Sequence, residues 1–166
     1  MISKKVCMLG AFAVGKTALV GRFISSIFED KYITTVGVNI KKKQIAVAGQ
    51  EVTLMIWDLA GEDEFQGVQL AHMRGAAGFL LVIDGTRRST LETALKLQER
   101  ATKEIGAMPF VVIVNKTDLL PQWEINDADL ADLAARGWTV LKGSAKSGAG
   151  VPEAFEALAT RAIGAA

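Results

Sequence analysis

Residues 6–20 read VCMLGAFAVGKTALV, and this stretch decides the fold. Its apolar start, residues 6–9, is typical of a buried strand, and the residues from Lys16 onward are typical of a helix. The loop between them, Gly10 to Thr17, has the pattern GxxxxGKT, in which a glycine-rich backbone wraps an anion in front of a helix N-terminus. The stretch therefore predicts a strand, a phosphate-binding loop and a helix in succession, as in an α/β domain.

The residue types in this loop predict how it would hold the phosphates of a nucleotide. Glycines permit the backbone conformation in which N–H groups surround the α- and β-phosphates. The Lys16 side chain is expected to reach the β- and γ-phosphates, and the Thr17 hydroxyl is expected to ligate Mg²⁺. An ordinary glycine-rich turn is the alternative, but it does not explain the strand before the loop and the helix after it. The predicted contacts are Ala13, Val14, Gly15, Lys16, Thr17 and Ala18.

A second motif, NKTD at residues 115–118, predicts which base is bound. It follows the apolar run 110–114, which is typical of a strand buried in a parallel sheet, and ligands bind at the carboxyl ends of such strands. The Asp118 carboxylate accepts two hydrogen bonds, which suits the N1–H and amine of guanine and not the same edge of adenine. Asn115 is expected to tie this loop to the phosphate loop, and the Lys116 stem to lie along the base. An ordinary polar turn is the alternative, which the phosphate loop disfavours.

A third, weaker signal is SAK at residues 144–146. The tripeptide Ser144, Ala145 and Lys146 follows the apolar run 138–141, and it would place the Ala145 backbone N–H against O6 of guanine. Together the three motifs predict that the chain binds GTP or GDP with Mg²⁺.

Two further positions are where a nucleotide-sensing switch needs them. Asp58 ends the apolar strand 52–57 and is expected to hold Mg²⁺ through a water, while the Gly61 N–H is expected to bond a γ-phosphate oxygen. Only a glycine allows so close an approach of the backbone. Thr35 is the predicted second hydroxyl ligand of Mg²⁺, which would order its loop only when GTP is present. Thr34 is a rival by one position.

With these motifs in this order, the chain resembles a Ras-superfamily small GTPase, nearest to the Rab branch, over essentially all of its 166 residues. YITTVGV at 32–38 resembles the Rab segment YxxTIGV, WDLAG at 57–61 resembles WDTAGQ, and MRGAAG at 73–78 resembles YYRGAAG. The resemblance adds Phe28, as an aromatic edge against guanine, and Tyr32 to the nucleotide-binding residues. It also implies that effectors, GTPase-activating proteins and exchange proteins bind switch regions 30–40 and 61–75.

Two residues depart from the family pattern, and both concern catalysis by the expected set Lys16, Thr35, Gly61 and Glu62. Glu62 stands where most hydrolysing members have a Gln, and an ionised Glu can accept a hydrogen bond but cannot donate one to the phosphoryl group. It acts as a base for water or is displaced from the γ-phosphate. Phe12 stands where Ras has Gly, so its ring either obstructs the catalytic side chains or packs over a switch as apolar cover. We predict slow unaided hydrolysis, at or below about 10⁻⁴ s⁻¹.

The alternation of strands and helices predicts one GTP-binding domain spanning residues 1–166. The expected fold is a doubly wound α/β domain with a six-stranded, mostly parallel sheet, one antiparallel edge strand and about five helices. Strands are expected at 4–9, 38–47, 51–57, 78–83, 109–114 and 138–141, with a hairpin at 48–50, and helices at 16–26, 64–74, 89–105, 127–136 and 151–163.

Composition restricts the surroundings and partners. The formal net charge is +1, which gives no electrostatic case for binding nucleic acid or an anionic membrane, and the run Lys41–Lys43 is interpreted as a solvated strand end. The one cysteine, Cys7, excludes an intrachain disulfide and favours a reducing compartment. The last residues contain no CaaX motif. We therefore expect a cytoplasmic GTPase of the prokaryotic kind without a lipid anchor, the alternative being a removed tail.

Two classes of function follow. The first is a molecular switch whose hydrolysis is weak unless a partner assists, because no arginine of the chain is recognisable as a finger and the lone histidine, His72, is too far along the chain from Glu62 to act as a base. The second is a hydrolysis-deficient GTP-binding scaffold, which Phe12 and Glu62 motivate. A P-loop kinase does not explain NKTD.

Overall fold

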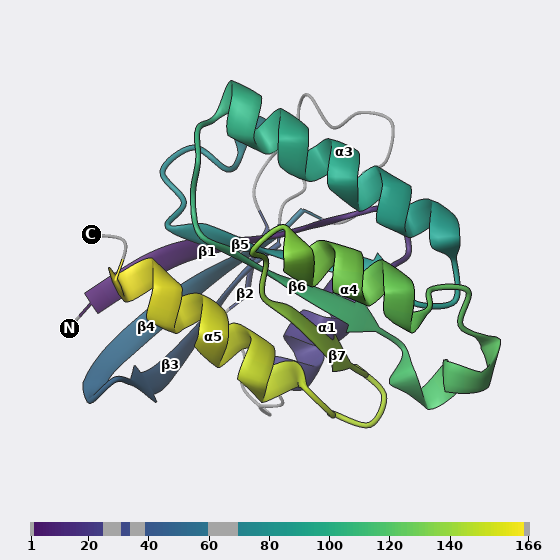
Figure 1. Cartoon of the computed structure of the whole chain (residues 1–166). Helices are drawn as coiled ribbons and strands as arrows, with labels where there is room; N and C mark the ends of the chain where they lie inside the picture. The colour runs from purple at the N-terminus through teal and green to yellow at the C-terminus, as the bar shows by residue number, and fades with distance from the viewer. Residues whose placement is uncertain (1, 25–30, 34–38, 60–69, 165–166) are drawn as a thin grey trace.

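The computed structural model has a central sheet with helices on both faces, and it describes residues 2–24, 31–33, 39–59 and 70–164 (Figure 1). The strands are β1 (Ile2–Gly10), β2 (Lys31–Ile33), β3 (Asn39–Val47), β4 (Gln50–Asp58), β5 (Gly78–Asp84), β6 (Phe110–Asn115) and β7 (Val140–Gly143). The helices are α1 (Lys16–Ile24), α3 (Arg88–Glu104), α4 (Asp127–Ala135) and α5 (Val151–Gly164), with a 3₁₀ helix η1 (Thr117–Gln122).

The sheet confirms the predicted doubly wound architecture. Its order is β2-β3-β4-β1-β5-β6-β7, in which β4, β1, β5, β6 and β7 are parallel and β3 is antiparallel to β4. Six of these strands are the predicted ones. The seventh, β2, pairs antiparallel with β3 over three residues, so the predicted edge strand lies one place in from the edge. Three residues are too few for an alternating pattern, which is why the sequence did not indicate β2.

The predicted hairpin joins β3 and β4 through a two-residue turn. Ala48 and Gly49 both have positive φ, 53° and 78°, and Val47 pairs with Gln50. Two successive residues with positive φ form a type I′ turn, whose twist matches that of the flanking strands. The turn therefore places a residue with a Cβ, Ala48, in a conformation that glycine or asparagine adopts more readily.

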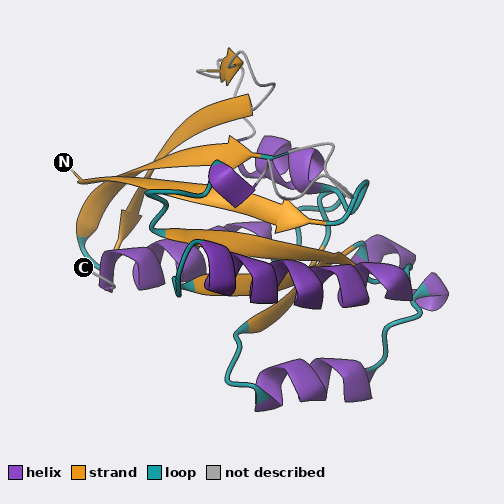
Figure 2. Ribbon diagram, turned by 90° about the horizontal axis from the view of Figure 1, so that it is seen from above, coloured by secondary structure: helices purple, strands orange, loops and turns teal. Residues whose placement is uncertain are grey.

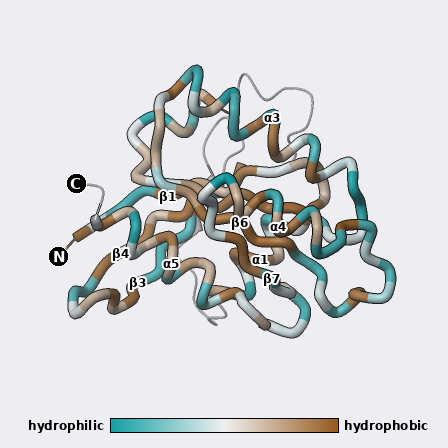
Figure 3. Tube along the Cα trace, viewed as in Figure 1, coloured by the Kyte–Doolittle hydropathy of each residue, from teal (hydrophilic) through white to brown (hydrophobic). Residues whose placement is uncertain are grey.

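The core has two layers, one on each face of the sheet. On one face α1 and α5 pack on the strands, and the rings of Phe23 and Phe155 stack with centroids 4.1 Å apart. On the other face α3 covers the sheet (Figure 2). There the rings of Phe79 and Phe110 stack with centroids 4.9 Å apart. All seven residues of β5 are buried. Because its strands are covered on both sides, the centre of the molecule forms a continuous apolar band (Figure 3), as expected for a parallel sheet.

The interpretation of residues 41–43 as a solvated strand end is wrong. Lys41 is only 9% exposed, and Lys43 Nζ donates to the Phe23 backbone oxygen at 2.6 Å while lying 4.6 Å from the centre of the Phe23 ring. Lysine stems cover apolar surface while the ammonium finds a polar partner. A run of like charges can therefore lie on a packed strand.

The sheet brings the functional motifs to one edge. Asp58 pairs with Met8 near the end of β1, Asp84 pairs with Asn115, and Asn115 pairs with Gly143, so the carboxyl ends of five strands lie together. The predicted helix at 64–74 falls mostly outside the described residues. Within the described ranges, no helix combines the length and the apolarity needed to cross a membrane.

Candidate functional site

The phosphate loop folds around its own lysine. β1 ends at Gly10 and α1 begins at Lys16, whose side chain is 4% exposed. Lys16 Nζ donates to the backbone oxygens of Gly10 and Ala11, both at 3.0 Å. Ala13 and Gly15 have φ of 61° and 104°, which bends the backbone into a ring before the helix. The N-terminal, positive end of α1 therefore faces the loop, as an anion site requires.

Gly15 is required by a neighbour that lies a hundred residues away. A Cβ at Gly15 would lie 2.3 Å from Nδ2 of Asn115, a separation that real atoms do not adopt. That same Nδ2 donates to the Val14 backbone oxygen at 2.9 Å. The tie between the phosphate loop and the NKTD loop, which the sequence predicted, is therefore present, and the second glycine of GxxxxGKT makes room for it.

Asn115 and Asp118 also join the third loop. Asn115 Oδ1 accepts from the Ala145 backbone N–H at 3.2 Å, and the buried Ser144 hydroxyl donates to Asp118 Oδ1 at 2.6 Å. The Ala145 N–H, which the sequence assigned to guanine O6, thus faces Asn115 in this structure. The Ser144 hydroxyl therefore orients the Asp118 carboxylate.

These loops enclose a pocket of about 350 Å³, which lies in the size range of small-molecule sites. One side comes from the phosphate loop and α1, and the other from the NKTD and SAK segments. The lining residues are Gly15, Ala18, Asn115, Lys116, Asp118, Leu119, Ala145 and Lys146. Except for Leu119, every one of them was predicted from the motifs.

A hydroxyl and a carboxylate meet beside the phosphate loop. Thr17 Oγ1 donates to Asp58 Oδ2 at 2.6 Å, and Asp58 is 2% exposed. Burial raises the pKa of the Asp58 carboxyl, although the Thr17 hydrogen bond and nearby lysine charges act to lower it. Its other oxygen, Oδ1, is buried and has no hydrogen-bond partner among the described residues. Oxygen donors with one unmet acceptor fit Mg²⁺, which prefers hard oxygen ligands.

Sequence reasoning missed Asp84, a buried carboxylate at the end of β5. Its Oδ2 accepts from Lys116 Nζ at 2.9 Å and from Arg87 Nε at 3.0 Å, while its Oδ1 accepts from the N–H and hydroxyl of Thr86. Burial acts to raise the pKa of Asp84, but these hydrogen bonds outweigh it and hold the pKa below its usual value. The signal was available, because Asp84 follows an apolar strand just as Asp58 does.

Trp123 is the second residue that was missed. Its Nε1 donates to the Lys116 backbone oxygen at 2.8 Å, and Lys116 has a φ of 82°, in the left-handed region. A Cβ at Gly85 would lie 2.2 Å from the Trp123 ring, so the ring occupies the space that glycine leaves. Trp123 therefore supports the NKTD loop, residues 115–118, from outside the motif. We call this loop the base clamp. Nothing local in the sequence indicates a contact of this kind.

Several predicted site residues lie outside the described ranges. These are Phe28, Thr34, Thr35, Gly61 and Glu62, together with most of switch regions 30–40 and 61–75. The backbone of Tyr32 is part of β2, and its side chain is not described. Their roles stay predictions.

Phe12 is described and is exposed on the phosphate loop. Its residue exposure is 56%, and its backbone oxygen accepts from Arg87 Nη2 at 2.8 Å. His72 lies against Trp57, with ring centroids 6.3 Å apart.

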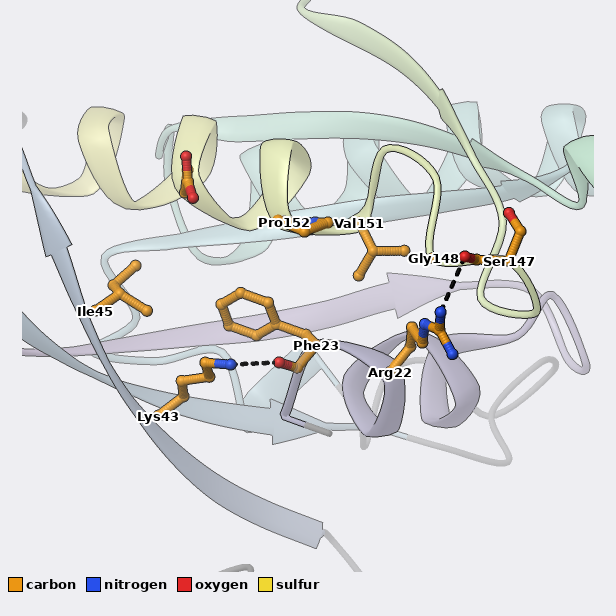
Figure 4. Close-up of a pocket in the computed structure, with 9 residues that line it drawn as sticks. Arg22, Phe23, Lys43, Ile45, Ser147, Gly148, Val151 and Pro152 are labelled. Carbon is orange, nitrogen blue, oxygen red and sulfur yellow. Dashed lines mark hydrogen bonds between the residues drawn. The ribbon is translucent and has the colours of Figure 1, made fainter. Parts of the chain in front are cut away.

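A larger cavity, about 590 Å³, lies between the end of α1, β3 and the start of α5 (Figure 4). Arg22 Nη2 donates to the Ser147 oxygen at 2.9 Å across one end, and Lys43 donates to the Phe23 oxygen at the other. Among the described residues that line it, none belongs to the three nucleotide motifs. The smaller pocket, where the motifs converge, is therefore the candidate site.

Comparison with known proteins places the chain in a family. The model of the Ras family matches residues 5–164. The dog protein Ras-related protein Rab-13 is 32% identical over 157 residues, which cover 93% of this chain and 77% of the relative. The human protein Ras-related protein Rab-8B is 33% identical over 160 residues, which cover 93% of this chain and 76% of that relative. Together with the nucleotide motifs at the carboxyl edge of the sheet, these matches show that the chain belongs to the Ras family of small GTPases.

Proposed function

We propose that this chain is a guanine-nucleotide-dependent switch that binds GTP and GDP with Mg²⁺ and hydrolyses GTP slowly unless a partner assists. The observation that carries the proposal is the pair of hydrogen bonds that Asn115 makes, donating to Val14 and accepting from Ala145, because they join the phosphate, NKTD and SAK loops around one pocket. Membership of the Ras family supports it. We further propose a single domain, residues 1–166, that acts in the cytoplasm and is of the prokaryotic kind.

The phosphates lie at the start of α1 in this proposal. Backbone N–H groups of Ala13 to Ala18 surround the α- and β-phosphates, aided by the helix dipole. Lys16 then exchanges its bonds to Gly10 and Ala11 for the β- and γ-phosphate oxygens. Because its ammonium is already buried inside the loop, little side-chain entropy is lost when the nucleotide arrives.

The base lies between Lys116 and Ala18 in the pocket. Asp118, oriented by Ser144, accepts from N1–H and the amine of guanine. The Lys116 ammonium is anchored on Asp84, which leaves its stem to cover the base. Ala145 and Lys146 flank the ring, and the family resemblance adds Phe28 and Tyr32.

Mg²⁺ would be held by Thr17 and Asp58, with Thr35 completing the set in the GTP state. When bound, the ion supplies positive charge beside the β- and γ-phosphate oxygens. The unmet Oδ1 of Asp58 supports this assignment, since a buried carboxylate is stabilised by a nearby cation.

Hydrolysis is expected to be slow because the chain supplies an incomplete catalytic set. In this proposal the Gly61 N–H bonds a γ-phosphate oxygen, whereas Glu62 acts as a base for water or is displaced from the γ-phosphate, and an ionised Glu cannot donate a hydrogen bond as a Gln does. Arg22, Arg87 and Arg88 are each bonded within the chain, to Ser147, Asp84 and Asp129 respectively. An arginine finger would therefore come from an activating protein, which, like effectors and exchange proteins, would bind regions 30–40 and 61–75.

A second candidate is a GTP-loaded scaffold that hardly turns over. The specific observation in its favour is the exposed ring of Phe12 on the phosphate loop, where it would obstruct an incoming arginine. In that case the state of the protein is set by nucleotide exchange alone.

Single-turnover hydrolysis of preloaded GTP with Mg²⁺ separates these functions. Wild type, Glu62→Gln and Phe12→Gly are compared alone and with lysate of the source cells. A switch predicts slow hydrolysis by wild type, at or below about 10⁻⁴ s⁻¹, with acceleration by lysate or recovery in a variant. Tight binding with no turnover in any sample would favour the scaffold, and rapid unaided hydrolysis by wild type would contradict the slow-hydrolysis proposal.

A further inference from the structure

The corner between β5 and α3, residues 84–87, touches both halves of the candidate site. Arg87 Nη2 donates to the backbone oxygen of Phe12 in the phosphate loop at 2.8 Å. Arg87 Nε donates to Asp84 Oδ2 at 3.0 Å, and Lys116 Nζ of the base clamp contacts that same oxygen at 2.9 Å. Asp84 Oδ2 therefore links Arg87, which contacts the phosphate loop, to Lys116, which belongs to the base clamp.

Asp84 is held as a fixed point. It has no exposed surface, and Thr86 donates to its other oxygen from both the N–H (2.9 Å) and the hydroxyl (2.7 Å). Its backbone is fixed as well, because the Asp84 N–H donates to Thr90 Oγ1 at 2.9 Å. A carboxylate constrained in this way cannot follow a moving partner, so its partners must adjust to it.

Arg87 transmits that position to the phosphate loop. The guanidinium is planar and its donors keep a fixed angle to one another, so binding Asp84 through Nε sets where Nη2 points. The carbonyl that Nη2 reaches belongs to Phe12, one residue before Ala13, where the backbone turns to positive φ. The Arg87 side chain thus braces the loop at its bend.

The same geometry argues against a purely stabilising role. The Arg87 side chain is 41% exposed, and without it Asp84 keeps the Lys116 ammonium and the two Thr86 donors, so removing the guanidinium leaves no unpaired buried charge. Arg88, its neighbour, makes the stronger structural contact, since it binds both oxygens of Asp129 at 2.7 and 2.6 Å and links α3 to the start of α4. The two adjacent arginines therefore have separable tasks.

We propose that Arg87 is a positioning residue that couples the phosphate loop to the base clamp through Asp84, and so slows release of the bound nucleotide. This inference rests on the proposed guanine-nucleotide function. Neither NKTD nor GxxxxGKT includes Arg87 or Asp84, and the coupling arises only where β5 ends between β1 and β6.

The test is the dissociation rate of GDP that carries a fluorescent ribose label, measured by stopped flow with excess unlabelled GDP and Mg²⁺. Arg87→Ala is expected to release GDP about tenfold faster than wild type, the effect of losing one charge-assisted hydrogen bond to the loop. Arg87→Lys should resemble Arg87→Ala, because an ammonium cannot span both acceptors in one plane. The thermal midpoint of Arg87→Ala should stay within about 2 °C of wild type, a shift that corresponds to a small change in stability.

Arg88→Ala is the matched control. It should lower the thermal midpoint through loss of the Asp129 contact and leave the GDP dissociation rate unchanged. Coupling is tested by combining Arg87→Ala with Lys116→Met, which keeps the stem and removes the ammonium. If both act through Asp84, the double variant should release GDP at least about threefold more slowly than the product of the single effects predicts.

Multiplicative effects, or an Arg87→Ala rate equal to that of wild type, would overturn the coupling while the nucleotide function stands. A wild-type protein that does not retain labelled GDP would overturn both.

Discussion

At the scale of single residues, Asn115 holds the site together. Its amide donates to Val14 of the phosphate loop and accepts from Ala145 of the SAK loop, and it is 2% exposed. Both partner groups belong to the backbone, so a substituted side chain would leave them unsatisfied. Gly15 has no Cβ where this amide approaches.

Asn115→Ala should therefore weaken both the fold and the site. We expect a loss of about 2 kcal/mol in the free energy of unfolding, because two buried polar groups lose their partner. GDP affinity should fall at least about tenfold, since the loops on both sides of the pocket are released. Urea unfolding and GDP titration measure the two effects. A loss of stability with unchanged affinity would show that Asn115 does not position the nucleotide.

Two buried carboxylates among the described residues, Asp84 and Asp58, give opposite pH dependences of stability. The pKa of Asp84 is lower in the folded chain than its usual value of 3.8, so its stabilisation is complete above that pH and is lost as the pH falls through the folded pKa. In Asp84→Asn, the loss of unfolding free energy below about pH 4 should be smaller than in wild type. Asp127→Asn, at a side chain that is 99% exposed, is the matched control. Parallel curves for all three proteins would contradict the assignment.

The ionisation of Asp58 changes stability with pH in the opposite direction. Burial raises its folded pKa above 3.8, so stability falls as the pH rises through the interval between the unfolded and folded values, and at neutral pH the ionised group costs stability. In the absence of nucleotide, Asp58→Asn should raise the free energy of unfolding at pH 7 by about 1 kcal/mol, as is common when a strained functional group is replaced. The same variant should bind GTP more weakly in Mg²⁺. Reduced stability in the variant would mean that the carboxylate is structurally required.

At the scale of elements, the β3–β4 hairpin carries a correctable strain. Ala48 occupies the first position of a type I′ turn with a φ of 53°, where asparagine is favoured. Ala48→Asn should raise the free energy of unfolding by about 1 kcal/mol, the cost of a left-handed conformation for alanine. The turn is far along the sheet from the nucleotide motifs, so GDP affinity should not change. Chemical denaturation of the two proteins decides this, and a destabilised variant would contradict the turn assignment.

The elements also show how far sequence reasoning reaches. The buried strands were predicted to within a few residues because apolar runs covered on both faces leave a continuous pattern, as in β5 and β6. The helix predicted at 127–136 is present as α4, and it begins at Asp127 because Asn126 forms a capping box with Asp129. The 3₁₀ helix η1 and β2 were not predicted, because both are short and neither has a periodic pattern. β7 begins two residues later than expected.

Contacts that depend on the tertiary fold could not be predicted from the sequence. The motif residues were found because each loop has its own pattern, whereas Arg87 and Trp123 act on Phe12 and Lys116 only after β5 and β6 pair. The Lys41–Lys43 run was misjudged for the same reason, since the packing of Lys43 on Phe23 requires α1 to lie against β3.

At the scale of the whole molecule, the parallel order of β4, β1, β5, β6 and β7 directs five carboxyl ends to one edge. Each end contributes a different group: Asp58, the phosphate loop, Asp84, Asn115 and Ser144. Ligands of doubly wound sheets bind at this edge. The site is thus a property of the topology, and the motifs supply its chemistry.

The most direct test of a guanine-nucleotide site is calorimetric titration of the purified protein with GDP and with ADP in Mg²⁺, beside Asp118→Asn titrated with GDP and with xanthosine diphosphate. Wild type should bind GDP at least about a thousandfold more tightly than ADP, because a site built to accept two hydrogen bonds rejects a base that cannot donate them. Asp118→Asn should bind GDP more weakly and xanthosine diphosphate more tightly than wild type does. The amide accepts one hydrogen bond and donates one, which matches the N1–H and the carbonyl of xanthine but not the N1–H and the amine of guanine. Equal affinities of wild type for GDP and ADP would contradict the account.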